Sequence, residues 1–488
     1  MSSSLRILIL SAEVAPFAKT GGLGDVAGAL PKALAALGHD VRVVMPAYQA
    51  QERAVRAGEG GFARLPGALA VPTGAGLLQA GVLKTVLPGS DVPVYLIAER
   101  SLFDRPNIYG YDDDPYRFAF FSRAALELVA SLGFRPDVVH AHDWHSAPAL
   151  MWLDTTGRRD DRFGDVATVF TIHNLAHQGR SSRRVARYLG ADVPPLLEES
   201  RGSEVNFMAR GIFHATLLNT VSPTYAREIM TPDGGNGLDP LLRARHYDVY
   251  GILNGIDYDV WNPATDANLV LDFDASRPER RVANKLALQE RLGLERNERV
   301  PLVAMVTRLD AQKGIEITSH VIHDLMSGLA GEAQFVLLGT GAKRYEDAFA
   351  HLAHYHSRKM AAVLTFAADL APQIYAGSDL FLMPSLFEPC GLGQLIAMRY
   401  GSVPVVRVTG GLADTVTDGH TGFTFQEFTA AAFWMALQRA LFVYNTDATG
   451  WTRLRHNGMD ANFSWGGAAH GYVQLYERAI SRTRSRHG

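Results

Sequence analysis

Short apolar stretches that alternate with helical stretches constrain the fold of this chain more than any other feature. Residues 5–10 have the composition of a buried strand, residues 22–38 carry apolar side chains on one helical face, and residues 41–46 form a second apolar stretch. Parallel neighbouring strands need a helical crossover of about this length, so the segment predicts a βαβ unit. Further apolar stretches lie at residues 92–97, 137–141, 166–172 and 215–221. The pattern predicts a doubly wound parallel sheet.

The pattern pauses at residues 251–263 and then repeats. New apolar stretches occupy residues 300–309, 333–339, 361–367, 379–385 and 402–408. A chain of 488 residues is also too long for one hydrophobic core. We therefore predict an α/β protein with two Rossmann-like, doubly wound domains, residues 1–252 and 253–464, hinged near residues 252–265. Ligands of such sheets bind at the carboxyl ends of the strands, so we expect the two domains to face a central cleft.

The C-terminal segment carries one more helical pattern, over residues 465–480. The Arg-rich stretch that follows, residues 482–488, is expected to be a solvated tail.

The bulk composition excludes several kinds of partner. Lys and Arg total 47 against 50 Asp and Glu, a formal charge of −3, so neither nucleic acid nor an anionic membrane surface is an expected partner. The N-terminus passes directly into the first predicted strand, and no apolar stretch reaches the length of a membrane span, so we expect a cytosolic protein. The single cysteine, Cys390, excludes an intramolecular disulfide and a multi-cysteine metal site.

A glycine-rich loop follows the first predicted strand. Gly22, Gly24 and Ala27 formally match the relaxed dinucleotide-binding fingerprint, so a dehydrogenase is one alternative. That fingerprint requires a tight turn and an acidic residue after the second strand, and neither is present. A flexible loop can instead let a phosphate approach the backbone, with Lys19 as its cation and Asp25 at the start of the helix. A loop that only packs is the remaining alternative.

Four histidines follow two later strands: His142, His145, His173 and His177. Imidazoles close in sequence can share a metal ion, but their spacing matches no established site and no further ligands cluster nearby. We therefore expect no metal, and neutral histidines that line a polar sugar pocket. His173, beside Asn174, could donate a hydrogen bond to a sugar hydroxyl or approach a reacting carbon through its carbonyl group.

The second predicted domain places one carboxylate between an apolar strand and a helix. Glu388 follows the strand at residues 379–385, and a helix opened by Pro389 is predicted over residues 391–400. Free N–H groups at a helix start can bind an anion, and a nearby carboxylate can act on what the anion carries. An ordinary strand-to-helix turn, whose Glu interacts with the helix dipole, is the alternative.

Two cations and the single cysteine are further candidate site residues of the second predicted domain. Arg308 and Lys313 flank a predicted strand-to-helix turn, where two positive charges suit a diphosphate whose charge grows when its bond to a sugar breaks. Cys390 could be a nucleophile, but the sequence indicates no residue that would act as its general base. A small packing residue in a tight turn is the preferred interpretation.

Eight segments of the chain together carry a resemblance to a known family. They are KTGGLGDV (19–26), HDWH (142–145), TIHNLAHQG (171–179), TVSPTYAREI (220–229), GILNGID with WNP (251–263), TRLDAQKG (307–314), FEPCGLGQL (387–395) and TGGLADTV (409–416). With these segments in this order over nearly its whole length, the chain resembles the bacterial glycogen synthases and the plant starch synthases.

The resemblance implies the GT-B fold and a glucosyl transfer, with retention of configuration, from ADP-glucose to the non-reducing 4-hydroxyl of an α-1,4-glucan such as glycogen or a maltooligosaccharide. It implies no essential metal or cofactor. It also implies that the last helix, within residues 465–488, crosses back to the N-terminal domain.

The resemblance implies catalytic roles for five residues. Glu388 would act on the glucose, His173 would lie beside the reacting carbon, and the cations would be Lys19, Arg308 and Lys313. The expected donor-binding residues are Lys19, Gly22, Asp25, Asp143, His145, Asn174, Asn254, Arg308, Lys313, Phe366, Cys390, Gly391, Leu392 and Gly393.

Several positions depart from the family pattern. Phe366 stands where a Tyr often stacks on the base, Gly393 stands where Thr is common, and Ile396 removes the second glutamate of many related transferases. Residues 208–210, Met-Ala-Arg, replace the frequent Leu-Lys-Ala and move or remove a cation. UDP-glucose as the donor and a catalytically silent glucan-binding relative are therefore alternatives. The sequence does not indicate an oligomeric state.

Overall fold

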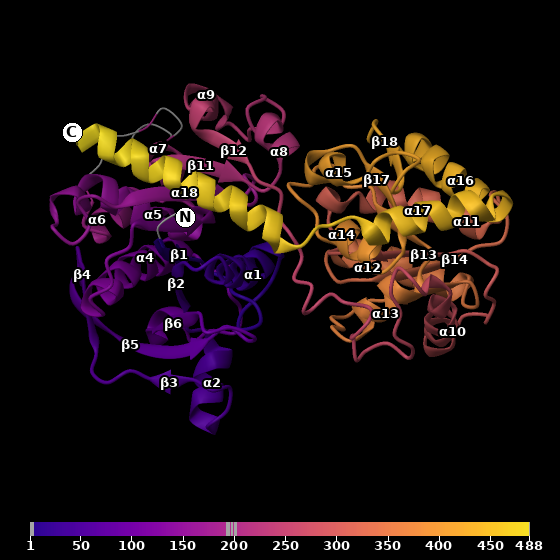
Figure 1. Cartoon of the computed structure of the whole chain (residues 1–488), viewed down its shortest axis with the longest axis horizontal. Coiled ribbons are helices and arrows are strands. Elements are labelled where there is room, and N and C mark those ends of the chain that lie inside the picture. The colour runs from indigo at the N-terminus through magenta and orange to yellow at the C-terminus, as the bar shows by residue number, and fades with distance from the viewer. Residues whose placement is uncertain (1–3, 192–195, 197–198, 200–202, 488) are drawn as a thin grey trace. The chain divides into compact units, whose positions relative to one another are not determined.

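The computed structural model describes residues 4–191, 196, 199 and 203–487. The chain divides into two compact units (Figure 1). The first comprises Met1–Gly255 and Trp465–Gly488, and the second comprises Ile256–Ser464. The boundary predicted from sequence, between residues 252 and 253, lies slightly before this division.

The main sheet of the first unit is parallel over most of its width. In spatial order its parallel strands are β12 (Val249–Gly251), β11 (Leu217–Thr220), β8 (Ala167–Ile172), β7 (Val138–His142), β1 (Arg6–Leu10), β2 (Asp40–Pro46) and β6 (Pro93–Ala98). The residues of β7 and β8 are buried throughout, as expected for strands covered by helices on both faces.

The far edge of this sheet is antiparallel, where a parallel arrangement was predicted. β5 (Gly76–Val86) runs antiparallel to β6 and also pairs with β3 (Ala63–Arg64) and β4 (Leu69–Thr73). Residues 87–92 join β5 to β6. This connection is too short for the crossover that parallel neighbours require, so the strand must return in the opposite direction.

Helices and a small two-stranded sheet complete the first unit. This sheet pairs β9 (Arg180–Ser182) with β10 (Glu204–Asn206) in antiparallel fashion. The helices are α1 (Gly22–Ala36), α2 (Gln49–Ala57), α3 (Arg100–Phe103), α4 (Asp114–Ser131), α5 (Asp143–Thr155), α6 (Arg184–Tyr188), α7 (Phe207–His214), α8 (Pro223–Glu228), α9 (Asp239–Ala244) and α18 (Trp465–His487).

The second unit is a parallel sheet with helices on both faces. Its strands, in spatial order, are β15 (Met360–Val363), β14 (Gln334–Leu338), β13 (Leu302–Val306), β16 (Leu380–Met383), β17 (Val403–Arg407) and β18 (Phe423–Phe425). One apolar cluster packs α11 (Ile315–Met326), α12 (Lys343–Tyr355) and α16 (Ala430–Thr446) on the sheet. Another packs α10 (Arg281–Arg291), α13 (Leu370–Gly377) and α14 (Gly393–Arg399), while α15 (Gly410–Thr415) and α17 (Ala448–Asp460) complete the unit. No helix in the described part of the chain is both long and apolar enough to cross a membrane.

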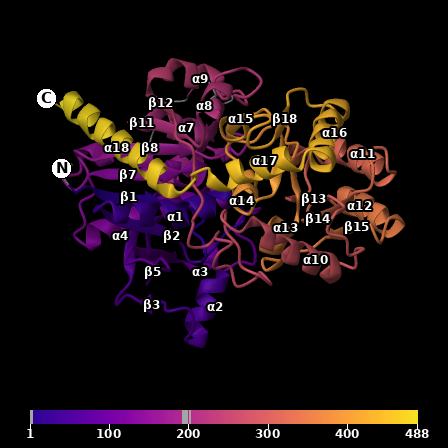
Figure 2. The same cartoon turned by 45° about the vertical axis from the view of Figure 1, so that its right-hand side comes forward.

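The C-terminal helix α18 packs on the first unit, against which it lies in both views (Figure 1, Figure 2). Its helical structure continues to His487, so the Arg-rich segment is the end of a helix rather than a separate tail, although residues 482, 484 and 485 are exposed as predicted. The reason is packing: Tyr476, Ala479 and Thr483 are buried on one face, and Arg482 forms an ion pair with Asp248. The apolar spacing that begins the helix therefore extends into the basic segment.

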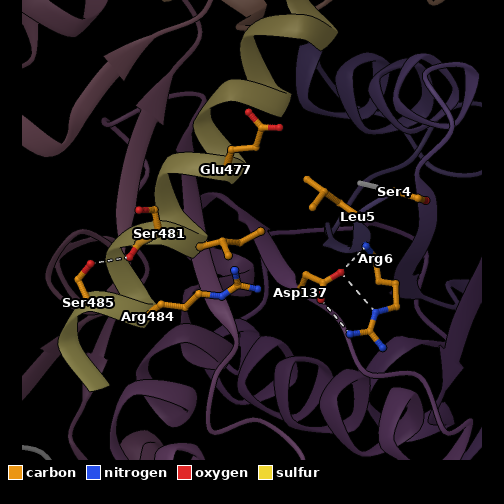
Figure 3. Close-up of a pocket in the computed structure, with 9 residues that line it drawn as sticks. Ser4, Leu5, Arg6, Asp137, Glu477, Ser481, Arg484 and Ser485 are labelled. Atoms are coloured by element: carbon orange, nitrogen blue, oxygen red, sulfur yellow. Dashed lines mark hydrogen bonds and ion pairs between the residues drawn. The ribbon is translucent and has the colours of Figure 1, made fainter. Parts of the chain in front are cut away.

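A pocket of about 720 Å³ lies beside the end of this helix (Figure 3). It opens at the amino ends of β1 and β7, which is the edge of the sheet opposite to the expected site residues. Its charged groups include an ion pair of 2.8 Å between Arg6 and Asp137, and Arg484. The basic end of the chain thus lines a pocket of the first unit.

Candidate functional site

In each unit, the residues expected at the site follow the carboxyl ends of parallel strands. In the first unit they follow β1, β7, β8 and β12, and in the second they follow β13, β15 and β16. Neighbouring parallel strands end at the same edge of their sheet. Each unit therefore carries its own set of expected residues.

An ion pair spans the glycine-rich loop after β1. Lys19 Nζ lies 2.7 Å from Oδ1 of Asp25, which stands in the first turn of α1, and Gly22 is the first residue of that helix. A Cβ atom on Gly24 would lie 3.1 Å from Cβ of Lys19, so glycine permits this close approach. Both charged side chains are partly exposed, which leaves the cation accessible to a ligand.

Glu13 shapes this loop, and sequence analysis missed it. Its buried carboxylate accepts hydrogen bonds from Thr20 N (2.5 Å), Thr20 Oγ1 (2.7 Å), Gly21 N (3.1 Å) and Tyr109 OH (2.7 Å). Several donors on one buried carboxylate hold the backbone before α1 in one conformation. The signal available in sequence was a single acidic residue between apolar residues directly after the first strand.

Asp143 and His173 come together at the ends of β7 and β8. Oδ1 of Asp143 accepts the backbone N–H of His173 at 2.7 Å, and Asp143 itself has a left-handed φ of 56°. A non-glycine residue in this conformation is uncommon and clusters at functional sites. Burial raises the pKa of Asp143 to about 7. His145 is also buried, and its ring stacks on Tyr109 with the centroids 4.7 Å apart.

The histidines form a ring-to-ring contact. Nε2 of His173 lies 2.8 Å from Nδ1 of His142, and burial lowers the pKa of His173 to about 3, so its ring is neutral at physiological pH. Within the residues that the structure describes, no group of three or more His, Cys, Asp or Glu side chains is arranged to hold a metal ion.

Asn174 and Asn254 have different surroundings. Oδ1 of Asn174 accepts the N–H of Ala176 at 3.0 Å, which is a local turn. Asn254 is 4% exposed, and its buried Oδ1 has no hydrogen-bond partner among the described residues. Leaving such an oxygen unpaired costs about 1–3 kcal/mol, so the amide of Asn254 is suited to accept a bond from a ligand.

In the second unit, Lys313 and Glu388 form an ion pair across the ends of β13 and β16. Lys313 Nζ lies 2.6 Å from Oε2 of Glu388, and Ser385 Oγ donates to the same oxygen at 2.9 Å. Glu388 is only 6% exposed. Its carboxylate is therefore paired with a cation of the same unit. Arg308 is more exposed and lies 3.4 Å from Oδ2 of Asp310.

The turn after Glu388 differs from the prediction. The helix was predicted from residue 391, but α14 begins at Gly393, because Gly391 has a left-handed φ of 71° that a right-handed helix cannot include. Cys390, buried, and Leu392 belong to the same turn. The N–H groups expected to meet a phosphate therefore lie on a glycine turn followed by a short helix.

Residues at and just after the end of β17 form hydrogen bonds and close contacts with the backbone around Glu388. Gly411 N donates to the carbonyl oxygen of Glu388 at 3.1 Å. A Cβ atom on Gly410 would overlap the same oxygen, so only glycine fits there. Arg407, which sequence analysis did not single out, donates from Nε to the carbonyl of Ser385 at 2.8 Å and also binds the carbonyl of Leu386. Arg407 thus holds the backbone that presents Glu388.

The positions that depart from the family pattern have clear surroundings. A Cβ atom on Gly393 would lie 3.2 Å from Phe381 Cε1 and 3.3 Å from Met383 Sδ, so a side chain here would press on β16. Phe366, after β15, is 88% exposed. Arg210 is buried and pairs with Glu199 at 2.7 Å, so its charge is already balanced within the first unit.

The buried Ile396 packs in the apolar core under the sheet of the second unit. It offers no charged group where related transferases have a second glutamate.

Comparison with known proteins covers both units. Residues 6–244 match the starch synthase catalytic domain, and residues 300–442 match the glycosyl transferases group 1. A glycogen synthase of Geotalea daltonii is 44% identical over 98% of this chain and 99% of its own, and one of Moorella thermoacetica is 43% identical over 99% of each. This chain belongs to the glycogen synthase family.

Solved structures agree with membership of this family. The catalytic domain of starch synthase IV from Arabidopsis thaliana, bound to ADP and acarbose, is 37% identical, with a TM-score of 0.91 over 98% of this chain and 100% of that chain. Sucrose-phosphate synthase from Thermosynechococcus elongatus is 18% identical with a TM-score of 0.59 over 98% and 99%, a likeness of fold alone. The prediction of a GT-B glycosyltransferase with two Rossmann-like domains is confirmed, and the dehydrogenase alternative is excluded.

Proposed function

We propose that this family member transfers glucose from ADP-glucose to the non-reducing end of an α-1,4-glucan with retention of configuration, and that it needs neither a metal nor a cofactor. The observation that carries the proposal is the buried ion pair between Glu388 and Lys313. It sets a carboxylate beside a cation at the carboxyl edge of the second sheet, as the transfer of a glucosyl group from a diphosphate requires.

The charges of Glu388 and Lys313 stabilise the two sides of the glucosyl–phosphate bond that breaks. When the bond between the anomeric carbon and the phosphate oxygen lengthens, positive charge develops on the sugar and negative charge on the diphosphate. Glu388 stabilises the sugar, while Lys313 and the more exposed Arg308 stabilise departing ADP. The backbone N–H groups of residues 390–393 offer further donors to phosphate.

Two groups of the first unit are suited to contact a sugar. Asp143 and the neutral His173 are fixed to each other by a hydrogen bond, and a neutral imidazole can donate to a sugar hydroxyl. The acceptor 4-hydroxyl then attacks the anomeric carbon from the face that ADP leaves. The new bond joins that carbon to the acceptor oxygen, and the hydroxyl proton passes to the leaving phosphate.

The proposed donor is ADP-glucose, and the support is twofold. The starch synthase IV structure, at 37% identity, is described as bound to ADP. Phe366 also presents an exposed ring on which a base can stack, and a purine offers a larger face than a pyrimidine.

A competition experiment tests the proposal. ADP-glucose and UDP-glucose, each labelled in the sugar with a different carbon isotope, are supplied at equal concentration with glycogen, and the incorporated label is counted. We expect the label from ADP-glucose to dominate, and new linkages to be α, as read from the anomeric proton signals. If the label from UDP-glucose dominated, UDP-glucose would be the donor instead. Binding of glucan without incorporation of either label would show a catalytically silent glucan-binding protein.

A further inference from the structure

A row of buried polar side chains joins His173 to the C-terminal helix within the first unit. His142 Nδ1 lies 2.8 Å from His173 Nε2, and the ring of His142 lies against that of His140 with the centroids 4.1 Å apart. His140 in turn contacts Tyr476 of α18 through Nδ1, at 2.9 Å. All four side chains are buried, so the row is shielded from solvent that could replace its bonds.

The hydrogen bonds fix the tautomer of His140. Thr171 donates its hydroxyl proton to Oδ1 of Asn219 at 2.6 Å, so the same hydroxyl can only accept from Nε2 of His140, which lies 2.6 Å away. The proton of His140 is therefore on Nε2, and Nδ1 accepts the hydroxyl of Tyr476. Burial lowers the pKa of His140 to about 3, which keeps the ring neutral.

The tautomer of His142 follows from its unpartnered ring nitrogen. Its Nε2 is buried and has no hydrogen-bond partner among the described residues. A buried N–H without a partner is rarer than a buried acceptor without one. The proton of His142 is therefore on Nδ1, and it is donated to Nε2 of His173. His173 must then carry its own proton on Nδ1.

We propose that His142 is a positioning residue for glucosyl transfer: it holds His173 in one ring orientation, with the proton on Nδ1. This inference rests on the proposed function. The contact with His142 occupies Nε2 of His173, so the N–H on Nδ1 is the one that can be donated to a sugar hydroxyl. Without the bond from His142, the ring of His173 could rotate and exchange tautomers.

Helix α18 anchors this row of buried polar side chains. Tyr476 binds His140 directly, and Tyr472 accepts from Nδ2 of Asn219 at 3.2 Å. The first bond holds His140 directly, and the second holds Asn219, which accepts the hydroxyl of Thr171 that His140 contacts. The C-terminal helix thereby contributes to the geometry of His173 without contacting a substrate.

Three substitutions of His142 test the role of its Nδ1 proton. His142→Phe keeps an aromatic ring but removes the donor. His142→Asn places an amide N–H close to the position of Nδ1, whereas His142→Gln places it close to the position of Nε2. We expect kcat to fall by about tenfold or more in the Phe and Gln variants, since misplacement by about 1 Å can cost 10²-fold. The Asn variant should recover most of the lost kcat, and KM for ADP-glucose should stay within about twofold throughout.

The tautomer itself is measured by NMR on protein labelled with ¹⁵N-histidine, with His173→Asn used to assign the His173 signals. We expect wild-type His173 to carry its proton on Nδ1, and the Phe variant to show both tautomers. A proton on Nε2 in the wild type would overturn the proposal, and so would full kcat in the Phe variant. If the wild type transferred no glucose, the proposed function would fail, while the tautomer measurement would still show whether His142 fixes the ring of His173.

His39 provides a matched control. It is a buried histidine of the same unit, at the amino end of β2, and its Nδ1 accepts the N–H of Leu5 at 3.1 Å. His39→Phe also removes one buried ring bond, but at the opposite edge of the sheet. We expect unchanged kcat and an unchanged His173 tautomer. A loss of kcat equal to that of His142→Phe would show a general effect of destabilising the unit and would overturn the proposal.

Discussion

Lys313 and Glu388 are joined by an ion pair of 2.6 Å, although 75 positions separate them in sequence. Their strands, β13 and β16, are neighbours in the sheet of the second unit, so their loops meet at one edge. The charge of the carboxylate proposed to act on glucose is therefore balanced by the protein itself.

The cost of breaking this pair can be separated from its role in catalysis. Lys313→Met leaves a buried carboxylate without its cation, so we expect the free energy of unfolding to fall by about 1–3 kcal/mol. Adding Glu388→Gln to that variant should recover part of the loss, because no unpaired charge remains. Urea unfolding of wild type, both single variants and the double variant gives the coupling. Additive losses would contradict a direct interaction.

Phe366 is expected to bind the donor base without contributing to stability. Because its ring is 88% exposed, Phe366→Ala should leave the unfolding midpoint unchanged. Stacking of a base on an aromatic ring contributes about 1–3 kcal/mol, so KM for ADP-glucose should rise by about tenfold. Phe366→Tyr should preserve KM. Tyr355→Ala, a change to another aromatic ring of the second unit that is 83% exposed, should have no effect; equal KM values for both alanine variants would argue against stacking.

Arg407 is expected to act through the backbone that presents Glu388. Arg407→Met removes its hydrogen bonds to the carbonyl groups of Ser385 and Leu386, so we expect kcat to fall by about tenfold through misplacement of Glu388. Arg439→Met removes an equal charge, from an exposed ion pair with Asp418, and should leave kcat unchanged. Steady-state kinetics of the two variants checks this, and similar kcat values for both would refute it.

Burial of His140 makes stability depend on pH. Its pKa is about 3 in the folded chain, against an ordinary value of 6.5, so between these values the unfolded chain binds the extra proton. Stability from this group is therefore complete above pH 6.5 and is lost as the pH falls, by about 1.4 kcal/mol per pH unit. Asp143, whose pKa is raised to about 7, contributes the opposite slope, so only a difference between variants isolates His140.

The comparison uses urea unfolding at pH values of about 6 and 4. His140→Asn should lose less stability on acidification than the wild type does. His351→Asn, a change to an exposed histidine of α12, should follow the wild type. The same loss in all three proteins would contradict the assigned burial effect.

Local sequence patterns were sufficient to predict the alternation of strands and helices and the edge at which the site residues lie. Both follow from short-range properties: apolar composition, helical periodicity and the rule that parallel strands share a carboxyl edge. Lys19, Asp143, His173 and Glu388 were placed in this way.

Contacts between distant segments could not be predicted. The bond between His140 and Tyr476 joins residues 336 positions apart, and nothing local in either segment indicates the other. No strand was predicted at β5, and its antiparallel direction is set by the short connection of residues 87–92 rather than by composition. The start of α14 depended on the left-handed conformation of Gly391, which a sequence permits but does not require.

Glu388→Gln tests most directly whether the carboxylate of Glu388 acts in glucosyl transfer, because it removes one charge while keeping the shape of the side chain. The measurement is the initial rate of glucose incorporation from labelled ADP-glucose into glycogen, compared with the wild type at saturating substrates. We expect a folded variant whose kcat is lower by on the order of 10²- to 10³-fold. Transfer at close to the wild-type rate would contradict this role of Glu388.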